Sequence, residues 1–327
     1  MNNSFGTTDK INAGKTILTA LLCLICIQCA AQRVVFTPAY TAQAQFAGYY
    51  VAKEKNFYSD EGLDVVIRHI GSGKKELAAD LLLEGQIDIA GQHMPQAILS
   101  RSQGDPIVNV FQLTQHLGLC CVTKKPIKSA KELDGLKIAK WANGYTEICE
   151  ALEKAEDVHI NWVLSFDPVN LFIFDAVDGV IVYSFNELIK LEQSVGGIDR
   201  ENIFAFADIP LLDIPEEGLF VTESFYNEHR DVVEKFVRAS KLGWDYAREY
   251  PEEALEISWR YIQDNNIVSN HQREKSMLEK HLNLQINPAT GKPDYARISE
   301  EKLKRLTEAM LKYGFIQNDI EYKDFIK

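Results

Sequence analysis

Residues able to hold a small molecule follow directly after the segments predicted to form strands. They combine aromatic rings with amides, two histidines and one carboxylate: Tyr40, Gln45, Phe46, Gly91, Gln92, His93, Gln115, His116, Trp141, Asn143, Tyr183, Asn186 and Glu187. Ligands of open α/β sheets lie beyond the carboxyl ends of the strands, so we expect these residues to line a ligand site. The mixture suits a small, flat, polar molecule that is stacked and hydrogen-bonded. It contains no cluster of Arg or Lys, which disfavours a multiply phosphorylated ligand.

Several of these residues also have a purely structural interpretation. Glu187 either binds the ligand or is an acid at a helix N-terminus, where the helix dipole favours negative charge. Trp141 suits a cleft or a core equally well. Single histidines at loop starts, such as His93 and His116, more often form hydrogen bonds than bind metal, so no metal site is predicted. The Gly-Ser-Gly-Lys-Lys stretch at 71–75 lacks the full phosphate-loop pattern.

The acidic, basic and nucleophilic residues of the sequence are not spaced as in a catalytic motif. Glu187, His93 and His116 are candidates, but the sequence fixes no arrangement among them. Cys120 and Cys121 are adjacent within an apolar strand, which indicates burial rather than redox chemistry. We therefore expect no catalytic residue and no cofactor.

The elements that must position these residues alternate between strand and helix, mostly with short connections. Residues 63–70 predict a β-branched strand and 46–55 a helix, and the alternation continues to a strand at 219–222. This order is typical of doubly wound α/β sheets. After residue 227, apolar residues recur at helical spacing on one face of 233–244. A length of 327 residues suits two domains or one large discontinuous one.

Charge and the N-terminal segment indicate an exported protein that does not bind nucleic acid. The chain has 47 acidic and 35 basic residues, for a net charge of -12, which argues against a phosphate-backbone binder. An apolar run at 17–27 follows Lys10 and Lys15 and precedes small residues, which predicts a signal peptide at 1–31 cleaved near Ala31. We expect a periplasmic location. A lipid anchor at Cys29 is the less favoured alternative.

A stretch rich in glutamine and aromatic residues at 43–58 is followed by comparable stretches at 61–65, 83–90, 127–138, 177–187 and 232–254. Together they resemble the periplasmic substrate-binding proteins related to thiamine-pyrimidine synthases. That branch includes binders of pyrimidine thiamine precursors and, more distantly, of alkanesulfonates. The resemblance covers essentially the whole chain after the signal segment.

The resemblance implies a type II periplasmic-binding-protein fold, with two doubly wound α/β lobes that close on ligand like a hinge. Two crossing strands are expected near 117–123 and 219–222. The first lobe is then 33–118 plus 219–327, and the second lobe is 119–218.

The function implied is that of a monomeric solute-binding protein of an ABC-type importer. It would deliver a small heteroaromatic compound, similar to a thiamine pyrimidine precursor, or a sulfonate to a membrane permease. A synthase-like enzyme of the same fold and a ligand-sensing subunit that partners a histidine kinase are the alternatives. Synthases of this superfamily hold pyridoxal phosphate on a lysine and carry a cysteine-rich iron motif. The matching positions here are Gln92 and Gln96, and no cysteine cluster follows Val182.

Overall fold

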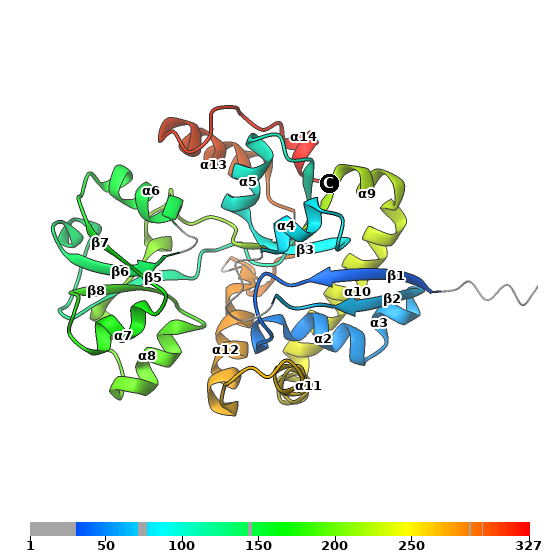
Figure 1. The fold of residues 1–327 in the computed structure, drawn as a ribbon, viewed down its shortest axis with the longest axis horizontal. Coiled ribbons are helices and arrows are strands. Elements are labelled where there is room, and N and C mark those ends of the chain that lie inside the picture. Colours follow the sequence, from blue (N-terminus) through cyan, green and yellow to red (C-terminus); the bar gives the residue numbers. More distant parts are fainter. Residues whose placement is uncertain (1–30, 71–76, 143–145, 288, 296) are drawn as a thin grey trace, which may run out of the picture.

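The chain forms two α/β lobes that lie side by side (Figure 1). The computed structural model describes residues 31–70, 77–142, 146–287, 289–295 and 297–327. Each lobe is built on one five-stranded sheet. The predicted two-lobe α/β fold is confirmed. The predicted signal segment, the alternative anchor at Cys29 and the candidate residue Asn143 lie outside the described residues.

The first lobe contains a sheet in the order β2-β1-β3-β10-β4. Its strands are β1 (Gln32–Thr37), β2 (Leu63–Ile67), β3 (Ile89–His93), β4 (Ile107–Gln112) and β10 (Glu217–Thr222). β1 pairs in parallel with β2 and β3, whereas β10 runs antiparallel between β3 and β4. The register places Glu217 opposite His93. The insertion of β10 therefore brings the start of a late strand to the carboxyl end of an early one.

The second lobe contains a sheet in the order β7-β6-β8-β5-β9. Its strands are β5 (Leu119–Thr123), β6 (Lys137–Trp141), β7 (Asn161–Ser165), β8 (Gly179–Tyr183) and β9 (Ile203–Ala205). β5 is again antiparallel to its neighbours and pairs Leu119 with Tyr183. Both sheets are mixed rather than fully parallel, because each contains one strand that arrives from the other lobe.

The chain passes between the sheets twice. It leaves the first sheet after Gln112 and enters the second at Leu119, then leaves at Ala205 and returns at Glu217. Residues 119–123 and 219–222, near which crossings are expected, belong to β5 and β10 within the sheets. The exact lobe boundaries remain a prediction.

Helices cover both faces of the sheets, and α12 (His271–Leu284) stands on the side of the first lobe that faces the second (Figure 1). The α-helices are α2 (Ala47–Glu54), α3 (Phe57–Asp60), α4 (Ala78–Leu83), α5 (Met94–Ser102), α6 (Thr146–Glu156), α7 (Pro168–Ile173), α8 (Glu187–Val195), α9 (Glu223–Glu228), α10 (Arg230–Glu249), α11 (Pro251–Asp264), α12 (His271–Leu284), α13 (Glu300–Lys312) and α14 (Tyr322–Phe325). Short 3-10 turns are η1 (Ala44–Phe46), η2 (Ala130–Leu133), η3 (Arg200–Asn202) and η4 (Phe206–Asp208), and β11 (Ile286–Asn287) pairs with β12 (Lys292–Pro293). Among the described residues, no helix has the length and apolar character needed to cross a membrane.

The predicted amphipathic helix is α10, which packs across α2 at two glycines. A Cβ atom on Gly243 would lie 2.0 Å from the Gly48 carbonyl oxygen, and one on Gly48 would lie 2.1 Å from the Trp244 ring. Trp244 is fully buried beneath this crossing. Only glycine allows the two backbones to approach so closely. This contact fixes the long helix against the first lobe's core.

Candidate functional site

A chamber with about 270 Å³ of empty space, part of it open to solvent, lies between the lobes, and we call it the polar chamber because most of its lining residues have polar groups. Its wall includes the N-terminal turn of α5, the start of α6, the end of β8 and the segment that returns to β10. The residues that line it are His93, Pro95, Gln96, Leu117, Glu147, Ile148, Tyr183 and Glu216. The predicted residues His93 and Tyr183 thus meet here, one from each lobe. A chamber built by both lobes changes its shape when the lobes move.

His93 and Tyr183 present nearly parallel rings to each other across the two lobes. Their ring centroids are 6.2 Å apart and their planes differ by 16°. The Tyr183 ring also packs against Phe185 at 5.1 Å. Burial lowers the pKa of His93, so the imidazole is neutral at pH 7. The pair therefore offers two uncharged aromatic faces, one on each lobe.

Glu216 places a carboxyl group beside these rings, and its side chain is only 3% exposed. One oxygen accepts a hydrogen bond from the Gly118 N–H at 2.9 Å, and the other lies 3.6 Å from His93 Nδ1. Burial raises the pKa of Glu216 to about 8, although the Gly118 N–H and the Tyr183 hydroxyl both favour the charged form. At neutral pH this carboxyl group is therefore mostly protonated.

Glu217, the next residue, belongs to a buried polar network behind the chamber. Its carboxylate accepts hydrogen bonds from Gln45 Nε2 at 2.8 Å and lies 3.2 Å from His281 Nε2. Gln43 Nε2 donates to Gln45 Oε1, and Gln285 Nε2 lies 3.3 Å from His281 Nδ1. The network joins the loop after β1 to β10 and α12. The predicted residue Gln45 thus holds the first lobe's wall in place.

A second polar contact between the lobes involves Asn186 and Glu187. Arg273 of α12 donates to the Asn186 side-chain oxygen at 2.5 Å. Glu187 accepts hydrogen bonds from the Tyr183 N–H at 3.0 Å and from Asn186 Nδ2 at 3.3 Å. Desolvation raises the pKa of Glu187, whereas the backbone N–H groups of Tyr183 and Glu187 and the charge of Arg273 oppose that rise. The Glu187 carboxylate thus lies at the N-terminus of α8 and already has partners. Its contact with a ligand remains a prediction.

Tyr40 lies near this second contact. Its side chain is about half exposed, and desolvation and the charge of Glu187 raise the pKa of its hydroxyl. Its backbone oxygen lies 3.0 Å from His69 Nδ1. Tyr40 therefore lies close enough to Glu187 of α8 and Arg273 of α12 for their charges to act on its hydroxyl.

Three other predicted residues lie within the first lobe, outside the chamber wall. Gly91 allows β3 to approach the loop after β1, since a Cβ there would lie 2.8 Å from the Ala39 nitrogen. Gln92 is buried, and its side-chain carbonyl oxygen has no hydrogen-bond partner among the described residues. Phe46 is fully buried, with its ring 6.0 Å from that of His69. Gly91 and Phe46 have packing roles that the sequence does not distinguish from ligand binding.

Gln115, His116 and Trp141 also lie outside the chamber wall. The backbone oxygen of Gln115 accepts a hydrogen bond from Lys302 at 2.5 Å. His116 Nδ1 lies 2.9 Å from the carboxylate of Asp213 on the returning segment. Trp141 is half-buried at the end of β6. Gln115 and His116 therefore connect one crossing segment to α13 and to the other crossing segment.

Sequence reasoning missed Glu216, Glu217, Arg273 and His281. The two glutamates follow Ile214 and Pro215, and a pair of acids beside a proline is typical of an exposed loop. Arg273 and His281 belong to α12, which was not predicted because its sequence, HQREKSMLEKHLNL, is mostly polar. No local pattern distinguishes these residues from solvated ones.

The residues around the chamber do not provide the groups that synthase chemistry needs. No lysine is among the residues that line it, and Gln96 forms part of the wall where the resemblance would place an amine. Cys120, Cys121 and Cys149 are buried free thiols with raised pKa values. Across the described ranges, no three His, Cys, Asp or Glu side chains are grouped so as to hold a metal ion.

Comparison with known proteins shows that this chain is similar in sequence to binding proteins and similar in fold to solved structures. The family model described as "NMT1/THI5 like" matches residues 43–254. The riboflavin-binding protein RibY of Chloroflexus aurantiacus is 24% identical over 299 residues, which are 89% of this chain and 83% of that protein. The formylaminopyrimidine-binding protein of Halalkalibacterium halodurans is 25% identical over 248 residues, 73% of each chain.

Among solved structures, the periplasmic aliphatic sulphonate binding protein SsuA from Escherichia coli superposes with a TM-score of 0.63 at 13% identity. The match covers 89% of this chain and 96% of that one. At this identity the likeness establishes the fold alone, which is that of periplasmic binding proteins.

Proposed function

The chain belongs to the NMT1/THI5-like family, and on that premise we propose that it is the solute-binding protein of an ABC-type importer. It binds a small heteroaromatic compound between its lobes and presents it to a membrane permease. Two relatives named for binding riboflavin and formylaminopyrimidine support this class of ligand, because both compounds contain flat nitrogen heterocycles. A sulfonate, suggested by the SsuA likeness, is less well supported because the described residues that line the chamber include no Arg or Lys.

The observation that carries the proposal is the facing pair His93 and Tyr183. A flat ring stacked between two others needs about 7 Å between them, since each carbon–carbon layer takes about 3.5 Å. The present centroid separation is 6.2 Å. A movement of the lobes that separates the two ring faces to about 7 Å would admit a ring between them. The carboxyl group of Glu216 beside them can exchange hydrogen bonds with the ring's edge.

The proposed location and partner follow from the same role. A signal segment at 1–31 would export the chain to the periplasm, where a monomer exchanges ligand with its permease. None of the described residues that line the chamber is a lysine able to form a Schiff base, and we propose that the protein does not catalyse a reaction.

Thermal shift and calorimetry with riboflavin, an aminopyrimidine and an alkanesulfonate would test the proposal. We expect a heterocycle to raise the melting temperature, because ligand at 100 times Kd adds roughly 2.7 kcal/mol to the unfolding free energy. His93→Ala and Tyr183→Ala should each weaken binding about tenfold or more, since each removes one stacking face. His116→Ala, which changes a histidine outside the chamber, is the matched control. No stabilisation by any heterocycle, or equal losses in all three variants, would contradict the proposal.

A further inference from the structure

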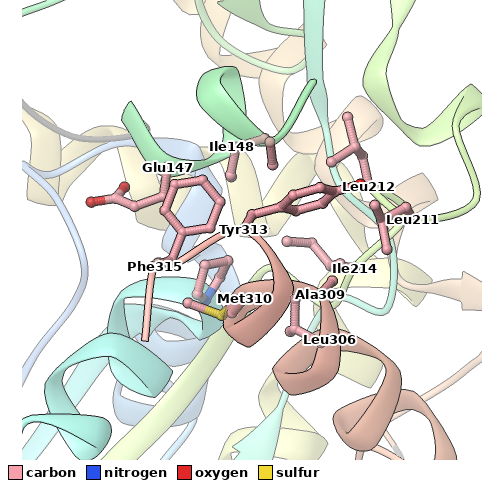
Figure 2. Close-up of a pocket in the computed structure, with 12 residues that line it drawn as sticks. Glu147, Ile148, Leu211, Leu212, Ile214, Leu306, Ala309, Met310, Tyr313 and Phe315 are labelled. Atoms are coloured by element: carbon pink, nitrogen blue, oxygen red, sulfur yellow. The ribbon is translucent and has the colours of Figure 1, made fainter. Parts of the chain in front are cut away.

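A second cavity adjoins the polar chamber and is almost entirely apolar. It contains about 400 Å³ of empty space, part of it open to solvent. Figure 2 shows Leu212, Ile214, Leu306, Met310 and Tyr313 arranged around it. Among its lining residues only Glu147 is charged. We call this cavity the apolar annex.

The annex and the polar chamber share a wall. Pro95, Glu147 and Ile148 line both cavities. On the returning segment, Ile214 faces the annex and Glu216, two residues later, faces the chamber. The two cavities are therefore adjacent, and an opening of this shared wall would let a molecule in the chamber extend into the annex.

Both lobes also build the annex. Ile148 and Ala151 come from α6 of the second lobe, while Leu306 and Met310 come from α13, which packs with the first. Lys154 of α6 donates a hydrogen bond to the Tyr313 carbonyl oxygen at 2.6 Å and lies 4.4 Å from the centre of the Phe315 ring. Movement of the lobes that opens the chamber would therefore also open the annex.

We propose that the annex receives the apolar part of the same ligand whose polar edge lies in the chamber. The site then selects fused heteroaromatic compounds that have hydrogen-bonding groups on one edge and an apolar ring on the other. This inference rests on the proposed function and adds the shape of the ligand. Apolar side chains favour such a ring over water, whereas a single polar ring would leave the annex empty.

Two ligands with the same polar edge test the inference. Lumichrome carries a dimethylbenzo ring fused beyond its pyrimidinedione, and thymine has the pyrimidinedione alone. We expect lumichrome to bind at least roughly tenfold more tightly, as for added apolar groups in a fitted pocket. Ala309→Phe, which fills the annex, should remove that advantage and leave thymine affinity within twofold. Glu308→Phe, on the exposed side of the same helix, is the control.

Each outcome decides the inference. Equal loss of both ligands in Ala309→Phe would assign the annex to lobe closure, and an unchanged lumichrome affinity would exclude it from the site. Either result overturns the inference while the proposed function stands. Failure of both ligands and of every other heterocycle to bind the wild-type protein overturns both. If Ala309→Phe does not fold, Met310→Gln makes the annex polar at nearly constant volume, and the same selective loss of lumichrome is expected.

Discussion

Glu216 should make the stability of this protein fall as the pH rises above neutrality. Burial raises its pKa to about 8 in the folded state, whereas an unfolded Glu titrates near 4.3. Between these values the folded state holds a proton that the unfolded state has released. The stabilisation is therefore complete below the unfolded pKa and is lost as the pH rises through the folded value.

The difference between wild type and a variant that cannot ionise at this position isolates the effect from the buried histidines. His69, with a pKa lowered to about 4, and His93, also lowered, give the opposite slope while their unfolded forms lose protons around pH 6.5, and both proteins share this contribution. One retained proton changes the unfolding free energy by about 1.4 kcal/mol per pH unit, and the group is half ionised at its folded pKa of about 8, so about 1.6 kcal/mol should be lost between pH 6.5 and 8. Glu216→Gln keeps an acceptor for the Gly118 N–H but cannot ionise. Its stability relative to wild type should rise by that amount.

Urea unfolding at pH 6.5, 7.25 and 8 measures this difference. Glu228→Gln removes an exposed carboxylate from α9 and controls for net charge. Parallel stability curves for wild type and Glu216→Gln would refute the reasoning, because they would mean that Glu216 is already ionised at pH 6.5 or has the same pKa folded and unfolded. A steeper loss in the variant would also refute it.

Three further outcomes are expected. Gly243→Ala should lower the free energy of unfolding by about 3 kcal/mol or prevent folding, because its Cβ would lie 2.0 Å from the Gly48 carbonyl oxygen. Thermal unfolding measures this loss. A loss below roughly 1 kcal/mol, as for a surface substitution, would contradict the packing argument. Glu187→Gln should cost only a few tenths of a kcal/mol of stability and leave ligand affinity within twofold, because its carboxylate lies at the N-terminus of α8 and already accepts from the Tyr183 N–H and Asn186 Nδ2. A tenfold loss of affinity by calorimetry would instead make Glu187 a ligand contact. His116→Ala should lower stability by about 0.5 kcal/mol through loss of its half-buried contact with Asp213 and leave affinity unchanged; weaker binding would place His116 in the site.

Local sequence pattern is sufficient for most of the fold. The β-branched run at 63–70 contains β2, and the apolar spacing at 233–244 lies within α10. These elements bury apolar residues at the period of their own geometry, so the signal is carried by neighbouring residues. α12 has no comparable signal because Glu274 and His281 are among its few buried residues. Their burial depends on partners at Ala44 and Glu217, which no local window contains.

Local sequence likewise predicts only part of the candidate site. His93 and Tyr183 could be predicted because they end β3 and β8, and ligand sites lie at the carboxyl ends of strands. Glu216 and Gly118 could not, because they precede β10 and β5, and the rule ignores the starts of strands.

Glu216 and Gly118 lie at the edge that faces the chamber because of the direction of the two strands that follow the crossings. β10 is antiparallel to β3, and β5 is antiparallel to β8, so the start of each lies at the end of its neighbour. Glu217 is thereby paired with His93, and Leu119 with Tyr183. In a two-lobe fold the edge facing the cleft therefore contains the carboxyl ends of the parallel strands and the residues just before the antiparallel ones. Those second positions are identified only when the strand order is known, and here they supply the buried carboxyl group of the chamber.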